Sequence, residues 1–430
     1  MTERLLQYIW QFQHFNRGGL MTAESEKLEV IHPGTCNTNQ GPDFLGAKIR
    51  IGSTVWAGNI ELHIRSSDWT RHKHSTDRNY RNVILHVVWL HDTPHELPFS
   101  TLVLEDRVSV FLLEKYDELM NSPGFIPCER NISAVDELNW TSWKERLLVE
   151  RLLQKTELVF SYLKKNNNHW EESFWWLLAR NFGLKVNSDA FEKIAMSLPL
   201  SLLSRHKNRL PQLEALLLGQ AGLLDHEFED DYPKLLQKEY LFLKKKYGLK
   251  KANAELMFLR MRPSNFPTVR LAQLAMLIHQ STQLFSKICQ ARHGKEVKNF
   301  FSFSTAGYWD HHYVFDVETR FKRKHLGAQM TDALMINSIV PIVFAYGMFH
   351  SDGYQKEKAL KWLEETRAEK NSISKGFAGL GIANATAFDS QAFIHLKNEY
   401  CDKRRCLDCA IGNWLMKTSP SAPKGGTGAE

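Results

Sequence analysis

Residues 41–64, GPDFLGAKIRIGSTVWAGNIELHI, decide the fold of the N-terminal region. Apolar and polar residues alternate on either side of Gly52-Ser53, the pattern of two half-buried strands joined by a tight turn. The predicted strands are Phe44–Ile51 and Val55–Ile64. Because successive side chains of a strand point to opposite faces, this hairpin has one apolar face and one polar face.

Flanking segments extend the hairpin into a larger domain. Short apolar runs bounded by turn residues predict further strands at Leu28–His32, Asn82–Leu90, Thr101–Leu104 and Val108–Leu113. Asn82–Leu90 is almost continuously apolar, as in a strand that is buried on both faces. With an amphipathic N-terminal helix and a polar helix and loop at Ser67–Arg81, the order is helix, three strands, helix, strand.

The chain after about residue 135 predicts helices and few strands. Leucine and aromatic residues recur there at helical spacing, in Glu137–Lys165, Glu171–Phe182, Asp189–Ser197, Leu210–Leu224, Tyr232–Lys246, Val269–Gln290 and Asp332–Tyr346. We therefore expect an α+β protein with an α/β domain at 1–134 and a large all-helical region, of one or two lobes, at 135–418. Residues 419–430 have the composition of a disordered tail.

Composition narrows the class of protein. The 430 residues exceed one ordinary core, and 43% hydrophobic with 24% charged residues is typical of soluble proteins. No apolar run approaches the length of a bilayer span, and the N-terminus lacks a signal-peptide pattern. We expect a cytoplasmic protein with no membrane partner. The net charge of +7 permits a nucleic-acid partner but does not require one.

The polar face of the hairpin carries the candidate chemistry. Glu61 and His63 lie side by side on the second strand, and the hairpin returns Asp43 from the start of the first. Two carboxylates that meet in this way repel each other unless a cation lies between them. Oxygen ligands suit Mg²⁺ or Mn²⁺, so Asp43 and Glu61 are the predicted metal ligands.

Asp43 followed by Glu61 and His63 on the next strand resembles the signature of the PD-(D/E)xK nuclease superfamily, and the element order resembles its core. The resemblance covers about residues 5–89 and implies a restriction-endonuclease-like fold and metal-dependent phosphodiester cleavage. It implies that the Leu62 carbonyl adds a ligand and that His63 orients the attacking water. The superfamily has lysine where His63 stands, so Lys48 or Arg65 is the candidate for the missing positive charge.

Two alternatives remain open for this segment. The motif is short, and a carboxylate and a histidine on a strand are also what a solvated sheet face presents. The main rival chemistry is a zinc hydrolase built from His72, His74 and His86. In a helix, residues two apart face away from each other. The zinc site is therefore less favoured than the Mg²⁺ site. His72 and His74 are instead candidates for contacting nucleic acid.

Two features of the helical region are candidates for binding. Arg260, Arg262 and Arg270 surround a proline-bracketed loop before a helix whose predicted N-cap is Thr268, an arrangement that suits phosphate. Cys401, Cys406 and Cys409 have the spacing CxxxxCxxC of a zinc or iron–sulfur site that lacks a fourth ligand, for which His395 and Cys36 are candidates. Buried thiols and a solvated helix face are the structural alternatives.

The chain also resembles, over most of its length, a family of uncharacterised bacterial proteins catalogued as a domain of unknown function. The stretches that carry the resemblance are GPDFLGAKI, NVILHVVW, LLLGQAGLL, RPSNFPTVRLAQL and the cysteine segment. The sequence as a whole predicts a Mg²⁺- or Mn²⁺-dependent nuclease, with Asp43, Glu61, His63 and Lys48 as its catalytic residues. The alternative is a non-catalytic nucleic-acid-binding or scaffold protein.

Overall fold

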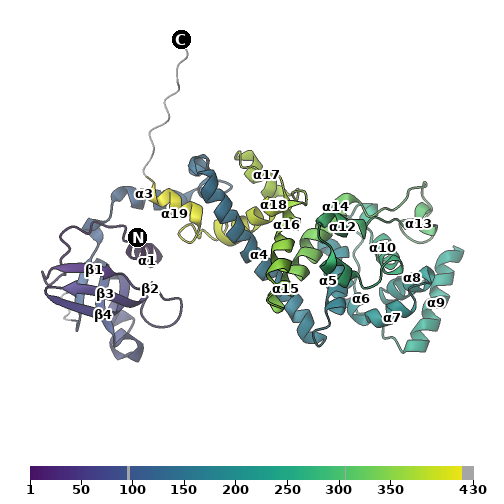
Figure 1. Cartoon of the computed structure of the whole chain (residues 1–430), viewed down its shortest axis with the longest axis horizontal. Coiled ribbons are helices and arrows are strands. Elements are labelled where there is room, and N and C mark those ends of the chain that lie inside the picture. The colour runs from purple at the N-terminus through teal and green to yellow at the C-terminus, as the bar shows by residue number, and fades with distance from the viewer. Residues whose placement is uncertain (94–96, 306, 419–430) are drawn as a thin grey trace, which may run out of the picture. The chain divides into compact units, whose positions relative to one another are not determined.

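The computed structural model describes residues 1–93, 97–305 and 307–418, and these divide into two compact units (Figure 1). The sheet unit comprises Met1–Trp140 together with the chain from Asn398 onward. The helical unit comprises Thr141–Lys397. The α+β class predicted from the sequence is confirmed: a mixed sheet with helices is followed by a large helical region. The predicted tail at 419–430 lies outside the described residues.

A mixed six-stranded sheet forms the sheet unit, in the order β1-β3-β4-β5-β6, with β2 also paired to β3. The strands are β1 (Leu28–His32), β2 (Thr35–Cys36), β3 (Phe44–Ile51), β4 (Thr54–Arg65), β5 (Val83–Leu90) and β6 (Ser100–Val103). The predicted hairpin is present as the antiparallel pair β3–β4, whereas β5 runs parallel to both β4 and β6.

One face of this sheet packs against α1 (Glu3–Gln11) and forms the core of the unit. Helix α1 begins after Thr2, whose hydroxyl accepts a hydrogen bond from the Leu5 backbone N–H, as a capping residue does. Its buried face meets apolar side chains such as Phe44 and Ile60, both fully buried. Because the alternation of β4 sends Ile60 into this core, its intervening residues face the opposite side of the sheet.

The segment between β4 and β5 covers that opposite side. It contains α2 (Asp68–Arg71) and two short 3₁₀ turns, at His74–Thr76 and Arg78–Tyr80. The predicted strand at Val108–Leu113 is wrong, because most of it belongs to α3 (Val110–Asn121). A short apolar run suits a strand or a helix equally, and here the sequence continues at helical spacing to Leu119, which is buried.

The C-terminal segment belongs to the sheet unit, although the sequence placed it with the helical region. It comprises a π-helical turn at Leu396–Cys401, which begins within the helical unit, and α19 (Ala410–Lys417). The Lys115 ammonium donates a hydrogen bond to the Leu415 carbonyl at 2.8 Å. Arg404 donates to the Leu119 carbonyl at 3.2 Å. These bonds tie the segment to α3.

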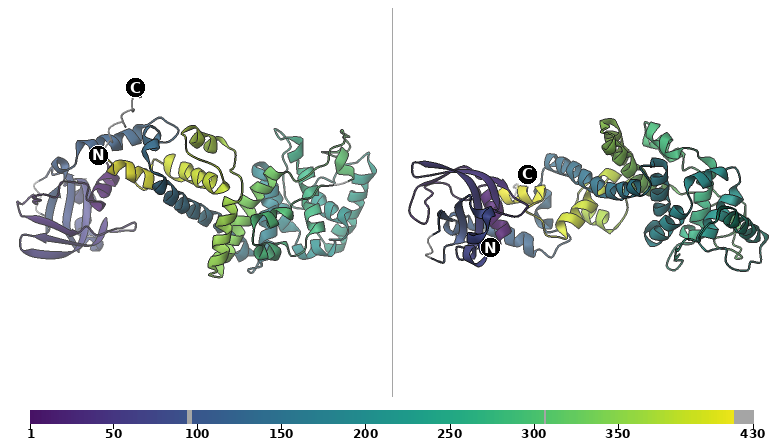
Figure 2. Two further views of the ribbon diagram at one scale, coloured as in Figure 1. Left: turned by 45° about the horizontal axis from the view of Figure 1, so that its top comes forward. Right: turned by 90° about the horizontal axis from the view of Figure 1, so that it is seen from below.

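Most of the predicted helices are present. The helices observed between residues 137 and 395 are α4 (Glu137–Lys165), α5 (Trp170–Phe182), α6 (Leu184–Ser197), α7 (Leu200–Arg205), α8 (Leu210–Gln220), α9 (Asp231–Tyr247), α10 (Pro267–Gln280), α11 (Leu284–Gln290), α12 (Gly294–Asn299), α13 (Tyr308–His311), α14 (Ala328–Leu334), α15 (Val340–Phe349), α16 (Gly353–Glu364), α17 (Ser372–Gly379) and α18 (Ala387–His395) (Figure 2). Six of them, α7, α12, α13, α16, α17 and α18, are not among the predicted helices. The predicted helix Val269–Gln290 is divided into α10 and α11, because the left-handed backbone of Gln283 (φ +50°) turns the chain.

One continuous helical stretch in the helical unit is strongly apolar. Ala328–Phe349 runs through α14, a π-helical turn at Met335–Ile339 and α15, and by length and composition it matches a membrane span. However, 67% of its most apolar window is buried within the protein. It therefore has the character of the central helix of a packed core.

Candidate metal centre

Strand β4 places two polar side chains on the face of the sheet opposite the core. Glu61 and His63 are buried there, with exposed fractions of 5% and 2%, while Leu62 between them enters the core. This is the alternation that the sequence predicts. A buried carboxylate beside a buried imidazole has a large desolvation cost, so the groups that face these two side chains decide what the site can do.

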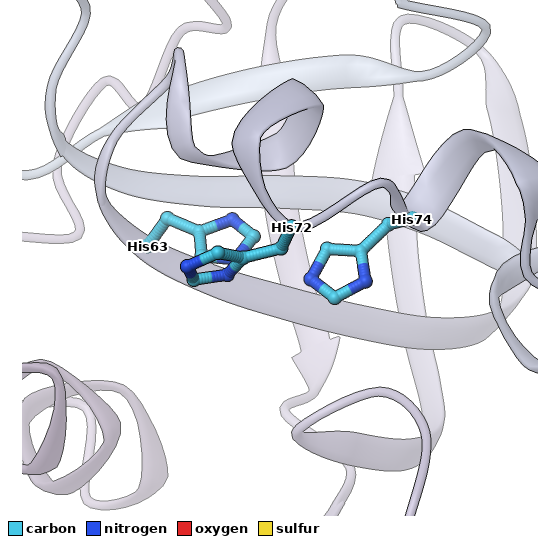
Figure 3. A group of neighbouring side chains, drawn as sticks. All are labelled: His63, His72 and His74. Carbon is cyan, nitrogen blue, oxygen red and sulfur yellow. The ribbon is translucent and has the colours of Figure 1, made fainter.

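The loop that follows β4 brings His72 and His74 to the same place (Figure 3). The sequence reasoning held that residues two apart in a helix face away from each other. His72 and His74 nevertheless converge, because Lys73 between them has a left-handed backbone (φ +59°). That conformation is unfavourable for a side-chain-bearing residue, and it turns the chain so that both flanking imidazoles face His63.

The ligand atoms of these side chains are spaced as around one ion. One ligand nitrogen from each of His63, His72 and His74 lies within 4.8 Å of the others. The Nε2 of His63 is 3.1 Å from the Nδ1 of His72. The Oε1 of Glu61 is 3.5 Å from the His63 Nε2 and 3.4 Å from the His74 Nε2. Roughly 2.1 Å bonds at tetrahedral angles give ligand separations of roughly 3.4 Å, which these three separations match.

A fourth histidine supports His63 from the neighbouring strand. His86 is opposite Glu61 in the β4–β5 register and is fully buried. Its Nε2 lies 2.9 Å from the His63 Nδ1. If the His63 Nδ1 carries the proton between these two nitrogens, the Nε2 lone pair of His63 faces His72 and Glu61. His86 therefore orients a ligand, as outer partners of metal-bound histidines do, and it is not itself part of the three-histidine group.

Asp43 lies beside Glu61, as the hairpin predicts, but its carboxylate is engaged by the protein. Its Oδ1 accepts a hydrogen bond from the Gln7 side chain at 2.8 Å, and its Oδ2 accepts one from the Leu62 backbone N–H at 3.0 Å. The Asp43 backbone N–H in turn donates to the Glu61 Oε2 at 3.1 Å. Glu61 therefore has one oxygen toward Asp43 and the other toward the histidines.

Burial controls the protonation of the cluster. It raises the pKa of Asp43 to about 6, and together with the nearby Asp43 charge it raises the pKa of Glu61 to about 9. Burial and the neighbouring histidines lower the pKa of His63 to about 2 and, with a smaller contribution from those neighbours, that of His86 to about 3. The imidazoles of His63 and His86 are therefore neutral near pH 7, and neutral imidazole is the form that binds a metal ion. Glu61 retains its proton at that pH when no cation is bound, so a metal ion that binds there displaces this proton.

The cluster is open on one side. His63 is buried, His74 is partly buried and His72 is exposed. The Tyr80 ring stacks on His74 at a centroid distance of 3.9 Å. The approach to the cluster therefore lies on the His72 side, where the loop also carries the exposed cationic residues Arg71, Lys73, Arg78 and Arg81.

Lys48 and Arg65 were proposed to supply the positive charge of the missing lysine. Lys48 lies away from this cluster, and Arg65 lies next to it. Lys48 pairs with Ala57 on β4, four residues before Glu61. At about 3.3 Å per residue this is roughly 13 Å along the strand. The side chain of Lys48 is exposed, so the structure does not bring it to the carboxylates. Arg65 is also exposed, two residues beyond His63 on the same face of β4.

In the helical unit, the arginine loop is divided between surface and core. Arg260 and Arg262 are exposed, but Arg270 is buried in α10, where its guanidinium donates to Gln273 and Asn265. Burial lowers the pKa of Arg270 to about 10. The helix begins at Pro267 with Phe266 as its N-cap, so the predicted cap, Thr268, lies within the first turn. Arg270 is therefore placed to stabilise the loop and is not available to a phosphate.

The three clustered cysteines are buried in the sheet unit, Cys401 in the π-helical turn and Cys409 just before α19. A further thiol, Cys128, is not among the metal ligands predicted from the sequence. Burial raises its pKa, and the nearby Cys409 and Cys406 raise it further. The metal that Cys401, Cys406 and Cys409 were predicted to share stays a prediction.

The sequence did not predict that His63, His72 and His74 would combine, although their spacing, HxxxxxxxxHxH, was a usable signal. Fold and site together define an α+β protein with a histidine-rich candidate metal centre. The chain belongs to the family described as Protein of unknown function (DUF2851), whose model matches residues 3–372. No curated protein and no solved structure matches it. The comparisons thus give no support to the nuclease resemblance.

Proposed function

We propose that this protein is a metal-dependent phosphodiester hydrolase whose ion is held by Glu61, His63, His72 and His74. The observation that carries the proposal is the convergence of three imidazole nitrogens within 4.8 Å, with a carboxylate oxygen 3.4 and 3.5 Å from two of them. Two of these side chains are almost fully buried. Such a concentration of lone pairs away from water is stabilised by a cation.

The donor set changes the expected metal. Carboxylate and carbonyl oxygens suit Mg²⁺, whereas imidazole nitrogen suits Zn²⁺ and other transition ions, including Mn²⁺ to a lesser degree. Asp43 is the second carboxylate of the predicted Mg²⁺ site, and both its oxygens already accept hydrogen bonds from the protein. We therefore propose a transition ion here, with Asp43 as a supporting residue that holds the Leu62 backbone beside Glu61.

The chemistry follows from an ion that is accessible to solvent on one side. A bound Zn²⁺ lowers the pKa of a coordinated water to near 7 and polarises a phosphoryl oxygen. If His72 or Glu61 yields its position to water, the remaining three protein ligands make the usual set of a catalytic zinc site. His72 is the exposed member, and the substrate therefore approaches from its side.

An anionic substrate is supported by the charges on the same loop. Lys73, Arg78 and Arg81 are exposed on the loop that carries His72 and His74, and Arg71 is exposed there too but pairs with Asp68 at 2.9 Å. Phosphate contacts in proteins come largely from such residues. The strand order gives further support. Helix α1, the antiparallel strands β1, β3 and β4, helix α2 and the parallel strand β5 follow one another as in the restriction-endonuclease-like core.

One observation favours the alternative of a non-catalytic nucleic-acid-binding or scaffold protein. Four protein donors can fill a tetrahedral shell completely, as they do in structural zinc sites. An ion held in this way would fix the loop between β4 and β5 and would leave no position for water.

The test separates metal binding from catalysis. Purified, untagged protein would be analysed for metal content, then stripped with a chelator and reloaded with Zn²⁺, Mn²⁺ or Mg²⁺. Each form would be assayed on bis(p-nitrophenyl) phosphate and on single- and double-stranded nucleic acid. We expect one transition ion per chain and hydrolysis that is abolished by His74→Gln, which removes a ligand that both arrangements retain. Stoichiometric metal without hydrolysis would establish the non-catalytic alternative, and absence of metal would reject both forms of the site.

A further inference from the structure

A second candidate binding site lies in the helical unit, apart from the metal centre. A cavity of about 540 Å³ opens between α5, α7 and α10 and the turn that leads to α11. Its apolar walls include Phe174, Trp175, Leu178, Leu277 and Leu284, all nearly buried by the helices around it. This volume is within the range of roughly 300–1,000 Å³ that small-molecule sites occupy.

The turn between α10 and α11 keeps the cavity from being filled by the protein. α10 ends at Gln280, and Gln283 adopts a left-handed backbone (φ +50°) that starts a new helix in a different direction. Leu284 then lines the cavity wall from α11. A continuous helix, as the sequence predicted, would have carried these residues elsewhere, so the turn creates the cavity.

The acidic residues at the cavity are already engaged. Glu171 accepts hydrogen bonds from the Phe285 and Ser286 backbone N–H groups, at 3.3 and 3.1 Å. Glu172 accepts one from the Leu200 backbone N–H at 2.9 Å. Carboxylates placed in this way at the first residues of α11 and α7 compensate the positive ends of those helices. Their charge is thereby offset within the protein.

Three other polar groups at the mouth can donate hydrogen bonds. Lys207 is partly exposed there and carries a positive charge. The Nδ1 of His169 accepts a hydrogen bond from the Glu172 backbone N–H at 3.1 Å, so the proton of the neutral imidazole lies on Nε2. Ser201 adds an exposed hydroxyl. Apolar walls with donors at the opening are complementary to a molecule that has an apolar body and one anionic end.

We propose that this cavity binds a small amphiphilic anion, with its acyl or aryl body between Phe174, Leu178 and Leu277 and its carboxylate at Lys207. The site is independent of the metal centre, because every residue that lines it belongs to the helical unit. It would supply the protein with a ligand-binding function besides the proposed hydrolysis.

Calorimetric titration of the full-length chain tests this proposal. The probes are decanoate, decanol and decyltrimethylammonium, each below its critical micelle concentration, which share one tail and differ in the charge of the head. We expect saturable 1:1 binding in that order of affinity. Lys207→Met should weaken decanoate roughly two- to fivefold, as for an ion pair at an exposed mouth, and should leave decanol unchanged.

A cavity-filling variant locates the binding. Ser201→Trp places a large side chain at the mouth and should abolish binding of all three probes, whereas Ser161→Trp, at an exposed position on α4, should leave it intact. Absence of saturable binding, stronger binding of the cationic probe, or insensitivity to Ser201→Trp would each overturn the proposal. Thermal unfolding of each variant confirms that the helical unit is folded.

Discussion

In the helical unit, the buried carboxylate of Glu214 accepts hydrogen bonds from the Tyr232 hydroxyl at 2.8 Å and the Trp309 indole at 2.9 Å. In the sheet unit, the buried carboxylate of Glu61 directs its Oε1 at two imidazole nitrogens, and one of them, the His74 Nε2, has no hydrogen-bond partner. Both carboxylates are removed from water. The protein donates two hydrogen bonds to Glu214. At Glu61 it donates one, from the Asp43 backbone N–H to Oε2, and the Oε1 atom faces imidazole nitrogens.

This difference distinguishes structural from functional polar groups. A buried polar group with protein donors rigidifies its surroundings and needs no ligand. Buried acceptor atoms that face one another, with no donor from the protein between them, are instead suited to a cation or another bound donor. By that criterion Glu214 and Arg270 stabilise the helical unit. The buried Glu61 and His63, together with the partly buried His74 and the exposed His72, form a site for a ligand.

The largest expected effect is the loss of metal from the sheet unit. His63→Gln and His72→Gln each remove one of four donors and should weaken Zn²⁺ binding well over a hundredfold, since even supporting residues contribute ten- to a hundredfold. The measurement is competition with a chromophoric chelator. His72 is exposed, so its loss should not impair folding. His226→Gln, at an exposed position of the helical unit, should bind as the unaltered protein does.

The next effect tests the other half of the comparison. Burial raises the pKa of Glu214 to about 7, above the value of about 4.3 expected for an unfolded chain. Below pH 4 the carboxyl is protonated in both states and its stabilising contribution is complete. As the pH rises toward 7 the unfolded state ionises first, so this contribution is lost, by about 1.4 kcal/mol per pH unit and ~4 kcal/mol in all.

Glu214→Gln should remove this dependence on pH. The amide oxygen of glutamine can still accept the bonds from Tyr232 and Trp309, so the variant should lose less stability than the unaltered protein between pH 4.5 and 7.5. Chemical unfolding at several pH values measures the difference. Glu227→Gln, at an exposed position, is the matched control. Equal pH dependence in both variants would show that Glu214 is ionised in the folded state.

The comparison also explains what the sequence could predict. The β3–β4 hairpin and the parity of Glu61 and His63 follow from alternation over twenty residues, which is a local pattern. The meeting of Asp43 with Glu61 follows from that hairpin. The positions of the loop ligands His72 and His74 do not follow from the hairpin, because they depend on the left-handed backbone at Lys73. A lysine, unlike a glycine, does not indicate that conformation in the sequence.

The errors in the helical unit have a similar origin. In the sequence, Arg270 is a cation near the start of a helix. The neighbouring sequence does not indicate that its guanidinium donates hydrogen bonds to Asn265 and Gln273. The predicted helix Val269–Gln290 has helical periodicity throughout, and the turn at Gln283 interrupts it with no glycine or proline to mark the break. Tertiary contacts decide both cases, and periodicity cannot report them.

A smaller effect should separate the two carboxylates of the hairpin. Asp43→Asn retains only one of the two acceptor oxygens that bind Gln7 and the Leu62 backbone. It should weaken metal binding about tenfold, as for a supporting residue, whereas Glu61→Gln should weaken it more than a hundredfold. The same chelator competition measures both. Equal and large losses would instead make Asp43 a direct ligand, as the sequence predicted.

The smallest expected effect concerns binding of nucleic acid by the helical unit. If Arg260 and Arg262 contact phosphates, the double variant Arg260→Gln/Arg262→Gln should reduce the slope of log affinity against log salt by up to about 2 for duplex DNA, because each contact releases roughly 0.9 of a counterion. Arg270→Met should leave that slope unchanged and lower the stability of the unit, since it removes hydrogen bonds from Asn265 and Gln273. Fluorescence anisotropy at several salt concentrations measures the slope.

A reduced slope in Arg270→Met at full stability would place Arg270 at the surface. An unchanged slope in the double variant would assign any binding to the cationic loop of the sheet unit, where Lys73→Gln and Arg78→Gln would then be expected to reduce it.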